Sequence, residues 1–225
     1  MLSRDDSELK LCIDLCSGLG GFSAAFVDAG WEVITVDIDP KFKPTICVDI
    51  LTLKAVDIEK ATKLSSFKSY DKVVIVASPP CNDFSTAGLV NGWPRRGIRD
   101  SFEMIGSVMV LVAEIRESVG ERHAWLVENP VSIIKHFMPR PMARIHLSDY
   151  GSPNKKPTYL WGNIKLPLVF AVGDWLKVPR QSNYRKKKMK ILGMPQGIMG
   201  MKSSAERAKM PYGLSQALLQ AVEEG

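Results

Sequence analysis

Apolar residues occur in short runs that are separated by glycine, proline and charged residues. Four of these runs have the length and β-branched content of buried strands: LKLCIDLCS (9–17), WEVITVDIDP (31–40), KVVIVASPP (72–80) and HAWLVENP (123–130). TICVDIL (45–51) predicts a further short strand, and ARIHLSDYG (143–151) with KPTYLWGN (156–163) predicts a closing pair.

The segments between these strands have helical spacing. FSAAFVDAG (22–30) predicts a helix that ends at glycine, and residues 56–68 predict a weak one. Residues 101–120 have one apolar face, formed by Phe102, Ile105, Val108, Met109, Val112, Ile115 and Val119. Strands that alternate with helices predict an α/β fold, with a mostly parallel sheet covered on both faces.

Composition and charge narrow the class of protein. The chain has 225 residues, enough for one substantial domain, and its formal net charge is +6. Basic residues cluster at 93–100, 153–156 and 183–190, which favours a polyanionic partner over a merely solvated surface. No apolar run is long enough to span a membrane and no signal-peptide core is present, so we expect an intracellular protein of the cytoplasm or nucleus without a membrane partner.

The four cysteines form no CxxC pair and predict no metal site. Cys12, Cys16 and Cys47 lie in apolar runs and are predicted to be core residues. Cys81 differs, because it follows Pro79 and Pro80 directly after a buried strand. Open α/β sheets place reacting groups at this position.

The first strand, the turn SGLGG (17–21) and the following helix form a loop whose backbone can approach a ligand closely. The next strand ends at Asp37, whose carboxylate can accept both hydroxyls of a ribose, and Asp49 follows the strand after it. The motif lacks the full dinucleotide fingerprint. The pattern therefore predicts a nucleoside ligand without a pyrophosphate; tight packing of the turn is the alternative.

Glu128 in WLVENP ends the fifth strand of the chain. In a doubly wound sheet that strand lies beside the fourth, so Glu128 and Cys81 can share one cleft. The alternative is that Glu128 only caps a following helix. A cysteine protease is excluded, because such an enzyme pairs its thiol with histidine and none of the three histidines occupies a suitable position.

The order DLCSGLGGF, an acid after the second strand, PPCNDFSTAG, ENP and YGSPNKKPT resembles the cytosine-5 DNA methyltransferase family over most of residues 11–163. The resemblance implies a Rossmann-like methyltransferase fold, a mostly parallel seven-stranded sheet with one reversed strand, plus a small recognition region. It also implies S-adenosyl-methionine as the cofactor and double-stranded, cytosine-containing DNA as the substrate. The segment KKPT is similar to variants in small phage-type members of the family.

The resemblance assigns roles residue by residue. Cofactor-binding positions are Asp14, Leu15, Ser17, Gly18, Gly20, Gly21 and Phe22 around the methionine end, Asp37 and Ile38 at the ribose, Asp49 and Ile50 at the adenine, and Pro80. Catalytic positions are Cys81, Glu128, Asn129 and Lys156. Positions expected to contact nucleic acid are Ser85, Arg95, Arg96, Arg99, Arg185, Lys186, Lys187 and Lys188.

In the implied reaction the Cys81 thiolate adds to carbon 6 of a flipped-out cytosine while Glu128 protonates ring nitrogen 3. The stretch NGWPRRGIRD (91–100) is expected to close over the flipped nucleotide with its arginines on phosphates. One departure lies in the eighth motif, where Asn154, Lys156 and Thr158 stand in place of the family's glutamine and two arginines. Lysine cannot reproduce an arginine fork, so the support of the base differs.

The expected organisation is a catalytic domain of residues 1–163 completed by a C-terminal helix of residues 205–225, with residues 164–204 as a short target-recognition region. RNA methylation by the same mechanism stays open as an alternative. So does an idle nucleic-acid-binding regulator, although such a protein has no need for Cys81, Glu128 and the glycine loop together. A third alternative is methylation of an exocyclic nitrogen, which uses a loop similar to SPPC and requires no covalent adduct.

Overall fold

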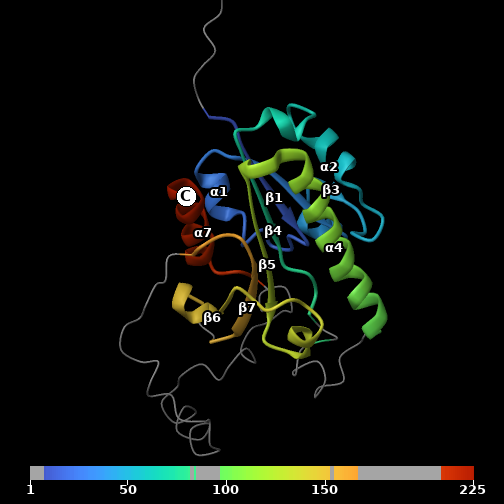
Figure 1. The fold of residues 1–225 in the computed structure, drawn as a ribbon, viewed down its shortest axis with the longest axis vertical. Helices are drawn as coiled ribbons and strands as arrows, with labels where there is room; N and C mark the ends of the chain where they lie inside the picture. Colours follow the sequence, from blue (N-terminus) through green and yellow to red (C-terminus); the bar gives the residue numbers. More distant parts are fainter. Residues whose placement is uncertain (1–7, 82–83, 85–96, 153–154, 167–208) are drawn as a thin grey trace, which may run out of the picture.

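The centre of the molecule is a seven-stranded sheet, drawn in Figure 1. The computed structural model describes residues 8–81, 84, 97–152, 155–166 and 209–225. The strands are β1 (Lys10–Leu15), β2 (Glu32–Asp37), β3 (Ile46–Cys47), β4 (Lys72–Ala77), β5 (His123–Pro130), β6 (Ala143–His146) and β7 (Pro157–Gly162). Their order in the sheet is β3-β2-β1-β4-β5-β7-β6.

Strand directions match the expected arrangement. β1 pairs in parallel with both β2 and β4, β2 pairs in parallel with β3, and β4 pairs in parallel with β5. β7 is antiparallel to β5 on one side and to β6 on the other. The prediction of a mostly parallel sheet with one reversed strand is therefore confirmed, and the reversed strand is β7.

Helices cover both faces of the sheet. The α-helices are α1 (Ala24–Asp28), α2 (Ala55–Ala61), α4 (Ile98–Val119) and α7 (Tyr212–Glu224). Short 3-10 turns are η1 (Pro40–Phe42), η2 (Phe67–Ser69), η3 (Gly120–Arg122), η4 (Ile133–His136) and η5 (Leu147–Tyr150). In Figure 1, α2 and α4 lie on one side of the sheet, and α1 and α7 lie together on the other.

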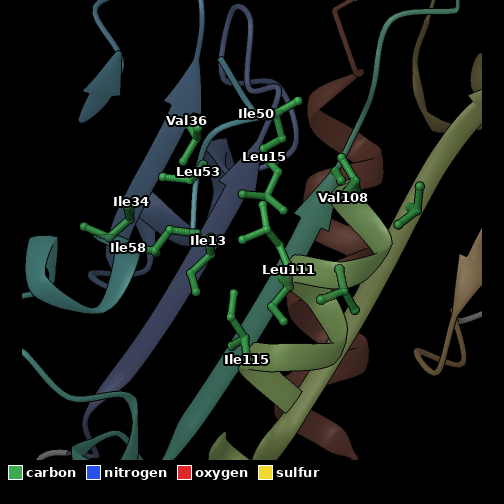
Figure 2. Packing of buried hydrophobic residues seen from close by; sticks show 14 of the residues in the cluster. Ile13, Leu15, Ile34, Val36, Ile50, Leu53, Ile58, Val108, Leu111 and Ile115 are labelled. Atoms are coloured by element: carbon green, nitrogen blue, oxygen red, sulfur yellow. The ribbon is translucent and has the colours of Figure 1, made fainter. Parts of the chain in front are cut away.

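The first core lies between the sheet and α4. Alternate residues of β1, among them Ile13 and Leu15, point to this face and are fully buried. Figure 2 shows them packed with Val108 and Leu111 of α4. Burial of one such side chain contributes about 1.5–3 kcal/mol, so the apolar face of α4 suffices to fix it on the sheet.

The second core uses the other face of the same strands. Cys12 of β1 and Val74 of β4 pack there against Phe26 of α1 and Leu218 of α7. Because β4 carries apolar side chains on both faces, its sequence is an almost continuous apolar run, and β1 differs only by Lys10 and the buried Asp14. The prediction of a sheet covered on both faces is confirmed.

Several element boundaries differ from the expectation. α4 begins at Ile98, earlier than residue 101, because Gly97 adopts a φ of 110° that allows the chain to enter the helix there. The C-terminal helix begins at Tyr212 and not at residue 205: residues 209–211 are not helical, and Pro211 cannot lie inside a helix. Residues 205–208 lie outside the described part.

Cys47 corrects another prediction. It was expected in the core, but it is exposed, because β3 has only two residues and lies at the edge of the sheet. Cys16 is only half-buried. Within the described residues, no helix is long and apolar enough to cross a bilayer, and no group of three or more side chains is arranged to hold a metal ion.

Candidate active site

The glycine-rich turn follows β1 at the edge where the parallel strands end. Its backbone is tied to β2 by a bond from the Ser17 amide to the Val36 carbonyl at 3.0 Å. Gly18 and Gly20 have φ values of 52° and 66°, a region that disfavours other side chains. Cys16 has a φ of 57° without being glycine, so the turn carries some backbone strain at the start of the loop.

Asp37 connects the turn to the end of β2. Its Oδ2 accepts a bond from the Gly18 amide at 2.8 Å, and its Oδ1 accepts one from the Asp39 amide at 2.9 Å. Each carboxylate oxygen keeps a lone pair for a further donor. Asp37 is thus held in a fixed orientation and can still accept two hydroxyl groups.

A pocket opens beside Asp37. Its lining consists of Cys16, Val36, Asp37, Ile38, Val48, Asp49, Ile50, Pro80 and Met104. Five of these positions had been predicted to bind the cofactor: Asp37, Ile38, Asp49, Ile50 and Pro80. The structure brings them together from three separate segments of the chain. Apolar walls with two carboxylates suit the flat base and the ribose hydroxyls of a nucleoside, so the residues present fit the cofactor that the sequence implies.

Asp14 lies below the turn with only 1% of its surface exposed. Its Oδ2 accepts a hydrogen bond from Ser23 Oγ at 2.6 Å. Burial raises the pKa of Asp14 to about 7, against the effect of the Ser23 bond. Leu15 and Phe22 are also buried, one in each core, so these three side chains support the loop from beneath.

The back of the loop rests on the C-terminal segment. A Cβ atom at Gly21 would lie 2.5 Å from the Met210 carbonyl oxygen, so only glycine allows this approach. Ser215 of α7 donates to the Phe22 carbonyl at 2.5 Å and accepts from the Ala25 amide at 2.9 Å. The residues around Ser17–Phe22 are therefore held from behind by a segment remote in sequence.

Cys81 and Glu128 lie beside each other, as the strand order predicted. Ala77 of β4 pairs with Val127 of β5, so the chain after β4 passes next to Glu128. Burial raises the pKa of the Cys81 thiol, while the charge of Lys156 lowers it and that of Glu128 raises it. Cys81 also follows Pro80, which lines the pocket. Cys81 thus follows a residue that lines the pocket, and its thiol is close enough to Glu128 and Lys156 for their charges to affect its pKa.

Glu128 is 1% exposed and holds hydrogen bonds on both oxygens. Ser78 Oγ donates to Oε2 at 2.9 Å, and Thr158 Oγ1 donates to Oε1. Lys156 Nζ lies 3.7 Å from Oε1. No helix is capped by this side chain, since Ser132 caps η4, so the capping interpretation of Glu128 is wrong.

Asn129 is fully buried next to Glu128. Its Nδ2 donates to the Pro79 carbonyl at 3.0 Å, which ties the segment before Cys81 to β5. Its Oδ1 is buried and has no hydrogen-bond partner in the described part of the chain. An unsatisfied buried oxygen is costly and is typical of a functional site.

The expected nucleic-acid contacts are placed only in part. Arg99 is exposed in the first turn of α4, where its Nε donates to Glu103 Oε1 at 2.9 Å. Ser85, Arg95, Arg96, Arg185, Lys186, Lys187 and Lys188 lie outside the described residues, as do Asn154 and most of the recognition region 164–204.

Sequence reasoning missed several residues of the site. Cys16, Val36, Val48 and Met104 line the pocket, and the hydroxyls of Ser78 and Thr158 contact Glu128. For Cys16, its place directly before the glycine turn in the sequence was an available signal. The other residues reach the site only through the fold.

The order of the strands, the reversed β7 and the pocket at the glycine turn define the class: a Rossmann-like methyltransferase fold. Comparison with known proteins points to one family. The model of C-5 cytosine-specific DNA methylase matches residues 11–119, which hold the glycine turn and Cys81. That part of the chain is similar to the cytosine-5 DNA methyltransferase family, whose members use S-adenosyl-methionine.

Curated relatives are type II methyltransferases. The chain is 35% identical over 83 residues to M.HgiGI of Herpetosiphon aurantiacus, a match of 34% of this chain and 63% of that protein. It is 27% identical over 176 residues to the putative M.MJ0563P of Methanocaldococcus jannaschii, a match of 68% of this chain and 56% of that protein. The chain thus spans less than two thirds of the length of either relative.

Two solved structures align with low similarity. The PH0226 protein of Pyrococcus horikoshii OT3 aligns with a TM-score of 0.32 and 15% identity, covering 61% of this chain and 58% of that one. The glycopeptide N-methyltransferase MtfA, in complex with S-adenosyl-L-homocysteine, aligns with a TM-score of 0.27 and 19% identity, covering 63% and 50%.

Proposed function

We propose that the protein is a DNA (cytosine-5)-methyltransferase that acts through a covalent bond between Cys81 and the base. The observation that carries this proposal is the position of Cys81. It follows Pro80, which lines the pocket beside Asp37, and it interacts electrostatically with the buried Glu128 and with Lys156. A thiol next to the cofactor pocket, within reach of the charge of a buried carboxyl group, suits attack on an aromatic ring that must be protonated at another atom.

Carbon 5 of cytosine is a poor nucleophile until a group adds to carbon 6. In the proposed reaction the Cys81 thiolate forms a bond to carbon 6 while the Glu128 carboxyl donates a proton to ring nitrogen 3, which gives a neutral enamine. After carbon 5 has been methylated, a base removes its remaining proton. The bond to Cys81 then breaks, the thiolate leaves, and nitrogen 3 returns its proton to Glu128.

The neighbouring residues support these steps. The Lys156 charge favours the thiolate of Cys81, and Lys156 Nζ lies 3.7 Å from Glu128 Oε1, so the same cation interacts with both reacting side chains. Asn129 fixes the carbonyl of Pro79 and thereby the segment that presents the thiol. These contacts give Lys156 and Asn129 roles beside the two reacting side chains.

The cofactor-binding assignments belong to the same proposal. Asp37 accepts the ribose hydroxyls, Asp49 and Ile50 adjoin the adenine, and residues 14–22 surround the methionine end. When bound, S-adenosyl-methionine supplies an electrophilic methyl group. Asp37 is oriented for its role by two backbone amides before any ligand arrives.

We propose double-stranded DNA as the substrate, with the target cytosine flipped out of the helix because carbons 5 and 6 lie inside the base stack. The net charge of +6 suits this partner. In the same proposal, the loop ahead of α4 contacts phosphates and residues 164–204 form a small recognition region beside the catalytic domain.

A DNA duplex that carries 5-fluorocytosine tests the mechanism. Fluorine replaces the proton that must leave carbon 5, so the enzyme should methylate the base once and stay bonded to it through Cys81. A denaturing gel with labelled duplex should show a band of the combined mass, which requires the cofactor. Mass spectrometry should locate the bond at Cys81.

Cys81→Ala is expected to abolish both turnover and trapping while cofactor binding persists, because residue 81 is outside the glycine turn. A parallel reaction with fluorinated RNA separates the RNA alternative from the DNA one. Methylation of cytosine by Cys81→Ala at the wild-type rate would end the covalent mechanism. Absence of any methylation of either nucleic acid by the wild-type protein would support the idle regulator.

A further inference from the structure

The geometry around Glu128 points to two further positioning residues: we propose that Ser78 and Thr158 form a hydroxyl clamp that holds the Glu128 carboxyl group in the orientation needed to protonate cytosine. This inference rests on the proposed function. The clamp is defined as the hydrogen bonds from Ser78 Oγ to Oε2 and from Thr158 Oγ1 to Oε1.

The sheet register explains how the clamp forms. Glu128 of β5 lies opposite Leu160 of the antiparallel β7, and Thr158 is two residues away on the same strand. Residues at this diagonal point to the same face, so the Thr158 hydroxyl reaches Glu128 from β7. On the other side, Ser78 follows Ala77, whose partner Val127 precedes Glu128. The carboxyl group is thus gripped from both neighbouring strands.

Burial makes these contacts consequential. Glu128 is 1% exposed and Thr158 is fully buried, so water cannot replace a lost hydroxyl. An unsatisfied carboxylate oxygen in such a place costs more than an ordinary hydrogen bond contributes. The carboxyl group would then rotate toward another donor, and Lys156 at 3.7 Å is the nearest charged one.

The clamp also distinguishes the two oxygens. Oε1 faces both the Thr158 hydroxyl and the Lys156 ammonium group, whereas Oε2 accepts only the Ser78 bond among the described residues. A proton is held less well on the oxygen that already faces a donor and a positive charge. The structure therefore assigns the transferable proton to Oε2, on the side of Ser78.

The clamp accounts for a departure from the family pattern in the sequence. Thr158 and Lys156 stand where the family usually carries arginines. An arginine fork fixes the plane of a carboxylate by two parallel bonds. Here the hydroxyl of Ser78, which follows β4, and that of Thr158 on β7 fix the plane, and Lys156 adds only charge.

Thr158→Val tests the clamp, because valine keeps the shape of threonine and removes the hydroxyl. We expect kcat for methylation to fall about 10- to 100-fold, the loss expected for one hydrogen bond to a charged group. KM for S-adenosyl-methionine should not change, since Thr158 does not line the pocket. In a single turnover, the rate of the covalent adduct should fall by the same factor. Thr158→Ser, which restores the hydroxyl, should recover most of the loss.

Thr62→Val is the matched control. Thr62 is also buried, and its hydroxyl donates to the Glu59 carbonyl at 2.7 Å, outside the candidate site. This variant should keep wild-type kcat. Ser78→Ala probes the clamp from the other oxygen and serves if Thr158→Val does not fold. The double variant should lose less than the product of the two single losses, because either single change already frees the carboxyl group.

Wild-type kcat in Thr158→Val or in Ser78→Ala would overturn the clamp, and so would a Thr158→Ser protein as slow as Thr158→Val. A loss confined to KM for the cofactor would overturn it as well. Each of these outcomes leaves the proposed function intact as long as Cys81→Ala is inactive. An active Cys81→Ala protein, in contrast, removes the proposed function irrespective of the clamp.

Discussion

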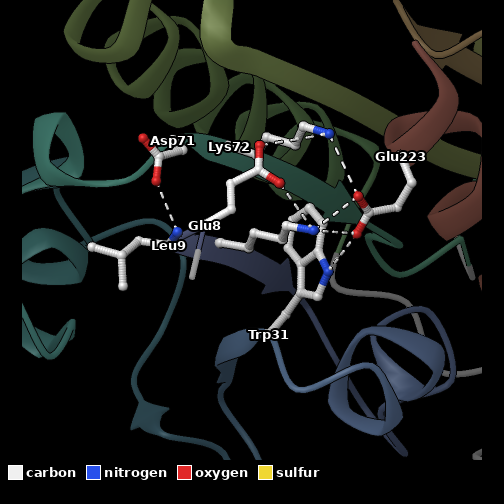
Figure 3. A network of polar contacts seen from close by, with 7 residues as sticks. Glu8, Leu9, Trp31, Asp71, Lys72 and Glu223 are labelled. Carbon is white, nitrogen blue, oxygen red and sulfur yellow. Dashed lines mark hydrogen bonds and ion pairs between the residues drawn. The ribbon is translucent and has the colours of Figure 1, made fainter. Parts of the chain in front are cut away.

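The two ends of the sheet treat charge in opposite ways. At the amino ends of β1 and β4, Glu223 of α7 accepts hydrogen bonds from Lys10 Nζ at 2.8 Å, Trp31 Nε1 at 3.2 Å and Lys72 Nζ at 3.4 Å (Figure 3). Glu8 adds a second carboxylate 3.1 Å from Lys10. These charged side chains are between 22% and 44% exposed, so water shares in their solvation.

At the carboxyl ends, carboxylates are buried with few positive partners. Asp14 and Glu128 are each 1% exposed, and their short contacts come from the hydroxyls of Ser23, Ser78 and Thr158. Burial without a full counter-charge costs free energy. The ion pairs at the amino end attach the C-terminal helix without a large desolvation cost. At the carboxyl end, the burial of Asp14 and Glu128 lowers the stability of the fold and keeps two acids at the candidate site.

Among the variants that test this difference between the two ends of the sheet, Asp14→Asn should have the largest effect. In the unfolded chain an aspartate titrates near 3.8, while in the folded protein the pKa of Asp14 is about 7. Between these values the folded state holds a proton that the unfolded state has lost, so stability falls as pH rises and levels off above about pH 7. Asparagine removes this loss and should make the variant more stable at pH 8, by up to several kcal/mol.

Urea unfolding of both proteins at pH 5, 6, 7 and 8 measures the effect. The difference in unfolding free energy between Asp14→Asn and wild type should grow from pH 5 to 7 and then stay constant. Parallel pH profiles for Asp14→Asn and wild type would mean that the Asp14 carboxylate is not penalised by burial.

Asp37→Ala should have the next largest effect, on binding and not on folding. Loss of the two ribose contacts is expected to weaken the affinity for S-adenosyl-methionine about 10- to 100-fold by calorimetry. Asp39→Ala is the control, because Asp39 is a neighbouring acid that does not line the pocket. Equal affinities for Asp37→Ala and wild type would remove Asp37 from the ribose.

Glu223→Gln, in the network at the amino ends of the strands, should have the smallest effect. Partly exposed ion pairs contribute little, so we expect a loss of unfolding free energy below about 1 kcal/mol, reduced further at high salt. Cofactor affinity and turnover should stay at the wild-type level. A loss of several kcal/mol would show that the amino-end network is as demanding as the buried acids.

Much of the fold could be predicted from the sequence because β1 and β4 are buried on both faces. β4 is an almost continuous apolar run that ends at two prolines, and β1 is apolar apart from Lys10 and Asp14, so both strands follow from the pattern. The reversed strand was implied by the family resemblance and not by the pattern. Residues at the edge of the sheet and at helix ends are harder to predict from the sequence. Cys47 was predicted to be a core residue because a two-residue edge strand is too short to show an alternating pattern. The C-terminal helix starts later than predicted, at Tyr212, because Pro211 interrupts the helical pattern.

Some residues of the candidate site could likewise be predicted from the sequence, and others could not. Asp37, Asp49 and Pro80 follow strands and could be assigned to one pocket, because the ends of parallel strands share an edge. Met104 could not, since its place on α4 marks it only as an apolar helix residue. Ser78 and Thr158 are polar residues at strand ends, and only the pairing of β5 with β4 and with the antiparallel β7 shows that both reach Glu128.

The contact between Ser215 and the glycine turn has a consequence for the order in which the protein is made. Ser215 bonds the Ala25 amide across a sequence separation of 190 residues. At synthesis rates of about 5–20 residues per second, the turn waits roughly 10–40 s for its support. During translation the first strands can pair and bury their apolar faces, but the backing of residues 21–25 requires the helix that holds Ser215. The glycine turn of the cofactor site is therefore supported only after synthesis has passed residue 215.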